Sequence, residues 1–308
     1  MKKLLFLSIV GFLVLLELFL RFYLGLCDTV IMKESSRYEY IAAPNQNVYR
    51  FRNHIFYNNF SMRSEPLRKD SRKILGLGDS VINGGVLTDQ DSLATTILSK
   101  RLSESIGEEI QVLNISAGSW GPDNCNAYLE ENGCFDAEVI VLVVSSHDVH
   151  DIMNFSPVVG VVNYFPTRKP HFAIMELWNR YLWPRVKSVF ITKENQKIQF
   201  EKDHGIKKDG IGFNPGFFQL KHKADSLGIP LVMYLHAEIS EIEANKYNDQ
   251  GEEIINFAVN NNIFLIKDLD FGFDKSDYRN RDNIHLSNKG QAKMAELIFP
   301  ILLDLMKN

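Results

Sequence analysis

Five short apolar runs alternate with helix-like stretches along most of the chain. They cover residues 73–77, 111–115, 139–144, 230–235 and 263–266. Apolar residues in 92–106 and 289–305 recur at the spacing of one helix face, so both stretches are predicted helices. The run VIVLVV at 139–144 is apolar at every position, as a strand buried on both faces is. The alternation predicts a parallel sheet of about five strands with helices on both sides.

The apolar pattern at the start of the chain is of a different kind. Two lysines precede residues 4–26, which are mostly apolar but include the charged Glu17 and Arg21. The stretch is long enough to cross a bilayer, and the two charged residues can pair on one helix face. Alanine first occurs at Ala42, so a good signal-peptidase site is missing. We predict an uncleaved single-pass anchor over residues 1–27, with a cleaved signal peptide and a buried amphipathic helix as alternatives. The two lysines favour a cytoplasmic N-terminus, with the rest of the chain outside the cytoplasm.

The remainder of the chain divides into a polar segment and one domain. Residues 28–72 are polar with scattered aromatics, and we interpret them as a membrane-proximal segment that packs on the domain. The domain covers residues 73–308, and an insertion at about 151–216 breaks its alternation of strands and helices. The insertion holds Trp178, Trp183 and several basic residues. Such an insertion often serves as a lid or substrate platform, and the alternative is a surface subdomain that only packs.

Composition and charge narrow the class of protein. The 308 residues carry a net charge of −4, which argues against the concentrated basic face of a nucleic-acid-binding protein. Cys27, Cys125 and Cys134 form no Cys-x-x-Cys motif, and no cluster has metal-ligand spacing, so neither a metal nor another cofactor is expected. Cys125 and Cys134 could form a disulfide in an oxidising compartment or could be free thiols. Cys27 follows an apolar stretch as a lipoprotein cysteine does, but the large Leu26 precedes it where lipidation needs a small residue.

A serine, a histidine and an aspartate from opposite ends of the domain are candidates for chemistry. The stretch GLGDSVINGG places Ser80 just past the end of the first predicted strand. In a parallel α/β sheet, active sites lie beyond the carboxyl ends of the strands. A serine hydroxyl needs a base before it attacks, and histidine is the usual base. RDNIHLSNKG, just before the last helix, supplies His285 and, three residues earlier, Asp282 to orient and stabilise its imidazolium.

Two further strand ends carry candidate groups for an oxyanion hole. NISAGSWG follows the second strand and contains Gly118, where the lack of a side chain lets the backbone N–H approach a ligand. VVSSHDVHD ends the third strand and contains His147 and Asp148. A side-chain donor there would complete an oxyanion hole together with the Ser80 N–H. We expect Asp148 and Asp79 to hold the surrounding turns by accepting backbone hydrogen bonds.

In these motifs the sequence resembles the SGNH hydrolases, also called GDSL esterases or lipases. GDS at 78–80 matches the block that carries the nucleophile, DNIHLSNKG at 282–290 matches the block that carries aspartate and histidine, and Gly118 matches the glycine block. The resemblance covers roughly residues 73–305. It implies a flavodoxin-like three-layer α/β/α fold and ester hydrolysis or acyl transfer through an acyl-serine. The residues that it implies are Ser80, Asp282 and His285 for catalysis, and Ser80, Gly118 and His147 for the oxyanion hole.

The third block departs from the family pattern. Where the family has Gly-x-Asn-Asp, residues 145–148 read Ser-Ser-His-Asp, so His147 takes the place of the asparagine that donates to the oxyanion. A neutral imidazole donates one N–H, so we expect His147 to be the third donor, in a way that depends on tautomer and pH. The alternative is a structural histidine, with water or another backbone N–H in its place. His236 and Glu238, after the fourth strand, lie in no motif and are interpreted as packing or surface residues.

The resemblance also bears on function. A single-pass anchor joined to such a domain outside the cytoplasm resembles bacterial envelope proteins that remove or add acetyl groups on polysaccharides. We therefore expect an esterase, in the narrower hypothesis an O-acetylesterase. Its partners would be an acylated carbohydrate or another ester and, through residues 1–27, the bacterial cell membrane. The alternatives are an O-acyltransferase on such a glycan and a non-catalytic glycan-binding or assembly protein that retains the fold.

Overall fold

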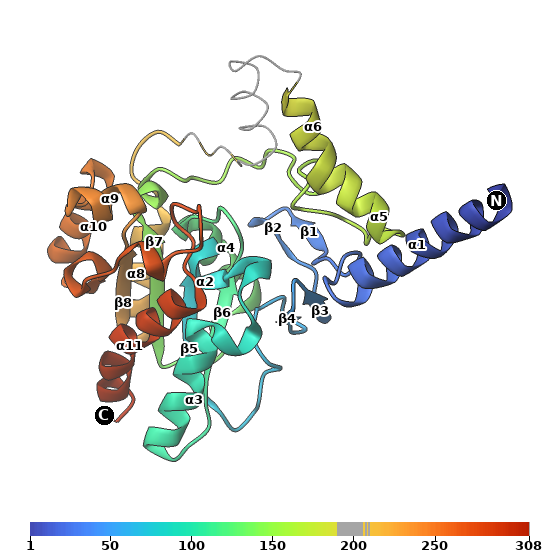
Figure 1. Ribbon diagram of the computed structural model, residues 1–308. Helices are drawn as coiled ribbons and strands as arrows, with labels where there is room; N and C mark the ends of the chain where they lie inside the picture. Colours follow the sequence, from blue (N-terminus) through green and yellow to red (C-terminus); the bar gives the residue numbers. More distant parts are fainter. Residues whose placement is uncertain (190–205, 207, 209, 308) are drawn as a thin grey trace.

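The computed structural model describes residues 1–189, 206, 208 and 210–307, and its centre is a five-stranded parallel sheet (Figure 1). The strands are β5 (Arg72–Gly78), β6 (Ile110–Ser116), β7 (Val139–Ser145), β8 (Leu231–His236) and β9 (Phe264–Lys267). Their order is β6-β5-β7-β8-β9, and every neighbouring pair is parallel. Each strand begins and ends within one residue of a predicted run, so the predicted sheet is confirmed.

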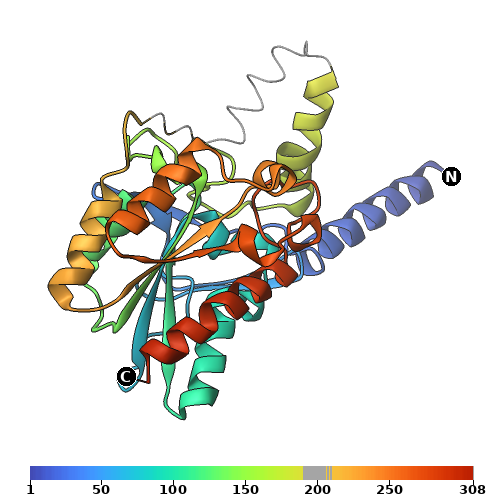
Figure 2. The same ribbon diagram turned by 90° about the vertical axis from the view of Figure 1, so that its left-hand side faces the viewer.

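Helices cover both faces of the sheet. One face is covered by α3 (Ala94–Ile106) and α11 (Asn288–Leu305), and the other by α4 (Pro122–Asn132), α8 (Gly216–Leu227) and α10 (Asp249–Asn260). Figure 2 shows the sheet between these two layers. The second strand lies at one edge beside the first, and the third, fourth and fifth follow on the other side, which is the flavodoxin-like order. The expected three-layer α/β/α fold is therefore confirmed.

Side chains along β7 alternate between two apolar cores. The core beneath α4, α8 and α10 takes Ile140, Leu142 and Val144, and the core beneath α3 and α11 takes Val139, Val141 and Val143. Because both faces of the strand are buried, every one of these positions is apolar. A shift of one residue along a neighbouring strand would exchange the two sets of side chains, so packing on both faces also fixes the register.

Residues 28–72 form two β-hairpins that the sequence pattern did not predict. β1 (Met32–Ser35) pairs with β2 (Glu39–Ala42), and β3 (Gln46–Arg50) pairs with β4 (Asn53–Tyr57), both antiparallel. These strands are four or five residues long, and their sequences combine polar and apolar positions irregularly. Alternation over so few residues does not stand out from a polar background.

A buried arginine ties these hairpins to the domain. Arg63 is fully buried and donates to the carbonyl oxygens of Asn83 at 2.8 Å and Thr88 at 2.6 Å, and also to that of Gly85. These carbonyls belong to the loop that follows Ser80. A buried cation must be compensated by polar partners, and here backbone dipoles provide the compensation. The segment before the sheet therefore helps to shape the loop beside the candidate nucleophile.

The N-terminal helix α1 (Lys2–Phe22) projects from the domain (Figure 1). It has a mean hydropathy of 2.4 over its most apolar window and is long and apolar enough to cross a membrane. The described part of the insertion contains α5 (Ala173–Glu176), the π-helical segment η4 (Leu177–Leu182) and α6 (Trp183–Val189), which form one continuous helical stretch. Its first turn packs against α1. Residues 190–205, 207 and 209, which the sequence analysis also assigned to the insertion, lie outside the described residues.

All three cysteines are free thiols. Cys125 is buried in α4 beneath the end of β5, with its Sγ 3.9 Å from the Gly78 carbonyl oxygen. Burial raises the pKa of the Cys125 thiol, so the group is neutral and behaves as a small apolar side chain. Of the two alternatives for Cys125 and Cys134, free thiols rather than a disulfide are what the structure shows.

Candidate active site

Ser80 lies where β5 ends, at the first residue of the short helix α2 (Ser80–Asn83). Asp79 caps this helix, since its Oδ1 accepts the Val81 N–H at 2.8 Å, which is the turn-holding role expected of it. Gly78 lies so close to β7 that a Cβ atom would be 2.5 Å from the Val143 carbonyl oxygen. The Gly-Asp-Ser sequence thus allows a close approach to the neighbouring strand and a capped turn, and it presents the serine hydroxyl at the edge of the sheet.

His285 and Asp282 reach Ser80 from the loop before α11. Ser80 Oγ lies 3.0 Å from His285 Nε2, and His285 Nδ1 lies 2.9 and 3.0 Å from the two carboxylate oxygens of Asp282. One tautomer of His285 satisfies all these contacts: Nε2 accepts from the Ser80 hydroxyl, and the Nδ1–H donates to the Asp282 carboxylate. Hydrogen bonds in this order activate a serine for attack. The fold thus brings together the three residues that the motifs singled out, although Ser80 and His285 are separated by most of the domain.

Asp282 is held as a carboxylate. Its Oδ1 accepts the backbone N–H groups of Ile284 at 3.0 Å and His285 at 2.9 Å, which closes the loop on itself. Burial opposes ionisation of this carboxyl group. The hydrogen bond and charge of His285, together with the two backbone N–H groups, outweigh burial and hold the pKa of Asp282 well below its usual range. At neutral pH the residue therefore presents a full negative charge to the imidazole.

A second, buried histidine–aspartate pair supports the loop that carries Asp282 and His285. His236, at the end of β8, has its Nδ1 2.6 Å from Asp268 Oδ2 and its Nε2 2.7 Å from the Ile284 carbonyl oxygen. Burial opposes a charge on the ring, but Asp268 and the Ile284 carbonyl outweigh it and raise the pKa of His236. The packing role expected of His236 thus includes a hydrogen bond to this loop. Its position at a strand end, on the same edge as Ser80, was the one available sequence signal.

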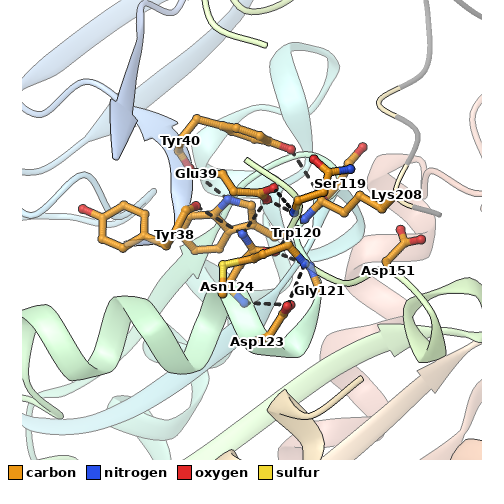
Figure 3. Close-up of polar contacts among 12 residues, drawn as sticks. Tyr38, Glu39, Tyr40, Ser119, Trp120, Gly121, Asp123, Asn124, Asp151 and Lys208 are labelled. Carbon is orange, nitrogen blue, oxygen red and sulfur yellow. Dashed lines mark hydrogen bonds and ion pairs between the residues drawn. The ribbon is translucent and has the colours of Figure 1, made fainter. Parts of the chain in front are cut away.

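Gly118 follows β6, the strand next to β5. Its carbonyl oxygen accepts a hydrogen bond from the Tyr40 hydroxyl at 2.9 Å. The Tyr40 carbonyl oxygen accepts one from Trp120 Nε1 at 2.9 Å, and both of these residues are labelled in Figure 3. These bonds fix the peptide planes of the glycine loop, which an N–H aimed at an oxyanion requires. Phe165, from the insertion, is the nearest group to the open side of Gly118, 3.7 Å from where a Cβ would lie. Sequence reasoning missed Tyr40 because it lies in a segment without a motif.

A buried ion pair lies behind the glycine loop (Figure 3). Lys208 Nζ is 2.8 Å from Glu39 Oε2 and 2.7 Å from Asn124 Oδ1, and Asn124 Nδ2 donates to Glu39 Oε2 at 2.8 Å. Glu39 Oε1 also accepts the N–H groups of Asn154 and Phe155. Burial opposes a charge on Glu39, but Lys208 and these hydrogen bonds outweigh it and lower the pKa of Glu39. The network joins β2, α4 and two distant parts of the insertion.

His147 lies just past the end of β7, among carboxylates. Its Nδ1 is 3.2 Å from Glu238 Oε1, and its Nε2 is 3.7 Å from Asp148 and 3.9 Å from Asp151. Burial favours the neutral ring, but Asp148, Glu238, Asp79 and Asp151 outweigh it and raise the pKa of His147 to about 10. His147 is therefore an imidazolium at neutral pH, whereas the sequence analysis assumed a neutral ring. Glu238, interpreted from sequence as a packing or surface residue, is a direct partner of this histidine.

The acidic groups around His147 are perturbed in turn. Asp148 Oδ2 accepts the Ser145 N–H at 2.7 Å, which is the expected turn-holding role. Burial raises the pKa of Asp148, and it raises the pKa of Asp151 to about 6. Donor atoms of Asp79, His147 and Asp148 lie within 4.8 Å of one another, so these three could reach one cation. Coordination through His147 would require its ring to lose the proton, because only the neutral imidazole binds a metal.

A substitution of His147 tests its role as an oxyanion donor. His147→Ala is expected to lower kcat for an activated ester by about 10²–10³-fold, because one donor is lost. His147→Asn keeps a donor and is expected to retain most of the activity. Since the pKa of His147 is raised to about 10, the wild-type ring loses its charge only above that pH, and kcat is expected to fall there in the wild type but not in His147→Asn. Steady-state kinetics from neutral pH to above pH 10 check both; equal kcat in wild type and His147→Ala would exclude the donor role.

Comparisons with known proteins give only remote similarities. We found no protein-family model and no curated protein sequence that the chain matches. Among solved structures it is similar to TesA, with 15% identity, a TM-score of 0.46, and coverage of 76% of this chain and 99% of that one. It is also similar to AlinE4, an SGNH-hydrolase family esterase, with 14% identity, a TM-score of 0.40, and coverage of 77% and 98%. A third is a two-domain esterase active on acetylated mannans, with 12% identity, a TM-score of 0.42, and coverage of 77% and 50%.

At these identities and TM-scores, the similarities do not by themselves indicate an activity. Three features of this chain match the pattern of the family that its motifs indicate. They are the strand order of the sheet, the Gly-Asp-Ser turn after the first strand of that sheet and the Asp-x-x-His loop before the last helix. The chain resembles the SGNH hydrolases. The chain differs from the SGNH pattern mainly in the third block, where the charged His147 takes the place of an asparagine.

Proposed function

We propose that the chain is a serine ester hydrolase that acts through an acyl-serine intermediate. The observation that carries the proposal is the chain of hydrogen bonds from Ser80 Oγ through His285 to Asp282, at the carboxyl edge of the sheet. A serine hydroxyl is a weak nucleophile on its own, and a base in direct contact with it, oriented by a carboxylate, removes that limitation.

In the proposed reaction, His285 takes the proton of the Ser80 hydroxyl as the oxygen attacks the ester carbonyl. Asp282 keeps the Nδ1–H of His285 oriented and stabilises the imidazolium that forms. The oxyanion is bound by the N–H groups of Ser80 and Gly118 and by His147. His285 then protonates the leaving alcohol. A water molecule, deprotonated by the same histidine, attacks the acyl-serine and releases the carboxylic acid.

As substrate we propose an acyl group, acetyl in the narrower hypothesis, carried by an envelope polysaccharide. What supports a carbohydrate is a pocket of about 540 Å³ beside Asp282, lined mainly by polar and charged residues that include Glu238, Lys275 and Asn283. Such a lining suits hydroxyl groups better than a long acyl chain. An O-acyltransferase would use the same acyl-serine and differ in the acceptor, so transfer to a sugar would exceed hydrolysis. A glycan-binding protein would form no acyl-serine.

We also propose that residues 1–27 anchor the chain in a bacterial cell membrane, with residues 28–72 and the domain at 73–308 outside the cytoplasm. The hydropathy of α1 supports this, as does the burial of only 6% of its most apolar window. Within the domain, residues 151–216 are proposed as the insertion. The two lysines that precede the apolar stretch favour this orientation.

A fluorophosphonate tests for the activated serine directly. We expect one covalent adduct, at Ser80: its oxygen bonds to phosphorus, fluoride leaves, and His285 takes the proton. Intact mass and peptide mapping of the full chain in detergent check this. Ser80→Ala should take up no label, and Ser226→Ala, an exposed serine on α8, should label fully. A folded protein without an adduct, or with an adduct on another serine, would contradict the proposal.

A further inference from the structure

The helical stretch formed by α5, η4 and α6, residues 173–189, carries an exposed apolar face; we call it the interface helix. Five apolar side chains of this stretch are exposed, and all but the neighbours Leu182 and Trp183 follow one another at intervals of three or four residues: Met175, Trp178, Leu182, Trp183 and Val186. Trp178 and Trp183 are each 48% exposed, with ring centroids 6.0 Å apart. Two tryptophans and three aliphatic side chains on one helix face form a patch that soluble surfaces rarely leave uncovered.

The opposite face of the interface helix is held by apolar packing and by a buried ion pair. Ala173, Ile174 and Leu177 pack against Leu20 and its neighbours near the end of α1. Glu176 is buried, pairs with Arg50 of β3 at 2.5 Å and accepts the Cys27 N–H at 2.5 Å. The outward direction of the apolar face is therefore set by packing on its inner side, and a simple rotation of the helix could not bury it.

The two charged residues that interrupt the apolar run of α1 hold this helix in place. The Glu17 carboxylate accepts the N–H groups of Ala173 at 2.8 Å and Ile174 at 2.9 Å, which are the first of the interface helix. Arg21 pairs with Glu17 at 2.9 Å and donates to the His171 carbonyl oxygen at 2.5 Å. A carboxylate at a helix N-terminus satisfies N–H groups that lack partners within the helix. The interface helix therefore begins beside the last two turns of α1.

This position coincides with the membrane boundary if α1 spans the bilayer. At about 1.5 Å per residue, the 21 residues of α1 extend for about 31 Å, which matches the hydrocarbon thickness of about 30 Å. The end at Phe22 then lies at the boundary with water. In both views the interface helix diverges from α1 at this end rather than running alongside it (Figures 1 and 2). The start of the interface helix therefore lies near the membrane surface.

A basic pocket opens beside the start of the interface helix. Its volume is about 690 Å³, and its lining combines Arg168, Lys169, His171 and Arg180 with apolar side chains such as Phe172. Lys169 pairs with Asp28, and Arg180 pairs with the buried Glu176, so their charge is partly compensated within the chain. Basic groups next to apolar ones at a membrane boundary match the phosphate and upper acyl chain of an anionic phospholipid.

We propose that the interface helix and this pocket form a second membrane contact, which binds the anionic surface of the bilayer that α1 spans. The inference rests on the proposed anchoring by α1. It commits to phospholipid rather than a second copy of the chain because the interface helix begins beside the end of α1 where Phe19 and Phe22 are 51% and 70% exposed, so its apolar side chains lie near the surface that α1 is proposed to hold in lipid. Tryptophan at the boundary and basic residues near headgroups are the side chains that such a contact uses.

Tryptophan quenching in nanodiscs tests the contact with the full chain. The discs contain phosphatidylcholine brominated at acyl carbons 6 and 7 or at carbons 11 and 12, with or without phosphatidylglycerol. The Trp178→Phe/Trp183→Phe variant retains only the buried Trp120 and supplies the baseline. The emission of Trp178 and Trp183 is obtained by subtracting the emission of the variant from that of the wild type. We expect bromines at carbons 6 and 7 to quench it more than bromines at carbons 11 and 12, and we expect acrylamide to quench it little. Phosphatidylglycerol should increase the quenching, and Arg168→Ala should remove that increase.

Each other outcome overturns a stated part of the inference. Emission that acrylamide quenches and bromolipid does not would place the helix in water. Emission shielded from both would mean a protein contact, through a second copy or a closure over the site. Stronger quenching by the deep bromines would exclude a surface position, and equal quenching with and without phosphatidylglycerol would exclude the anionic headgroup. Co-elution with the discs reports on α1 separately: a chain that does not co-elute loses the anchoring and the inference with it, whereas labelling of Ser80 is unaffected by either result.

Discussion

Replacing Ser80 by alanine is expected to reduce kcat for p-nitrophenyl acetate by about 10⁴–10⁶-fold. The reason is that the acyl-serine can no longer form. His285 and the oxyanion donors would remain, and they account for the residual rate above that of water alone. The fold is expected to be unchanged, because Ser80 is only partly buried and its hydroxyl forms hydrogen bonds, among the described residues, with the side chains of His285 and Asp79. The measurement is steady-state hydrolysis by the full chain in detergent, beside thermal unfolding of both proteins.

Two companion variants sharpen the Ser80→Ala result. Ser226→Ala removes an exposed hydroxyl on α8 and should keep wild-type activity. Adding His285→Ala to Ser80→Ala should cause little further loss, because residues that act as a unit are not additive. Retention of more than a tenth of the activity in Ser80→Ala would remove Ser80 from the mechanism. A folded wild type without activity would favour a transferase with a strict donor, or a binding protein.

Asp282→Asn is expected to lower kcat by about 10⁴-fold while leaving KM nearly unchanged. An amide cannot stabilise the imidazolium of His285, and its NH₂ group would favour the tautomer that holds Nε2–H toward Ser80. The loop should survive, because the amide oxygen can still accept the Ile284 and His285 N–H groups that Asp282 Oδ1 accepts. Kinetics on the same ester, with a melting temperature for each variant, check this expectation.

The control for Asp282→Asn is Asp225→Asn, an exposed aspartate on α8 that forms an ion pair with Lys221 within its own helix. It should have no effect on kcat. Near-normal activity in Asp282→Asn would point instead to Asp79, whose Oδ2 lies 3.3 Å from Ser80 Oγ and competes for the hydroxyl proton. A melting temperature far below wild type in Asp282→Asn would assign the loss to the loop rather than to the charge.

The main elements of the candidate site could be found from sequence because each one sits at a strand end within a local motif. Gly78 and Asp79 mark the turn before Ser80, and the spacing of Asp282 and His285 lets one loop present both. The supporting residues had no such signal. His236 with its partner Asp268, Glu238 beside His147, and Tyr40 behind Gly118 meet their targets only through the fold. Contacts between distant segments leave no periodicity in either segment.

The N-terminal region shows the same division. The sequence predicted that Glu17 and Arg21 share a helix face and can pair, and they do so at 2.9 Å. It could not show that Glu17 also receives the first N–H groups of a helix more than 150 residues away. From the sequence, the pairing of Glu17 with Arg21 only made the two charges acceptable in an apolar helix. In the structure the same pair also holds the start of the helix at residues 173–189 by hydrogen bonds.

The sequence by itself determined the five sheet strands to within one residue and the helices at 92–106 and 289–305 to within two, since burial of one face or of both imposes a period that can be read locally. The tertiary structure decided the hairpins of residues 28–72, whose strands are too short for a visible period. It also decided the charge of His147. A pKa depends on the summed distances to every nearby charge, and here those charges come from the ends of β5, β7 and β8, which only the folded sheet brings together.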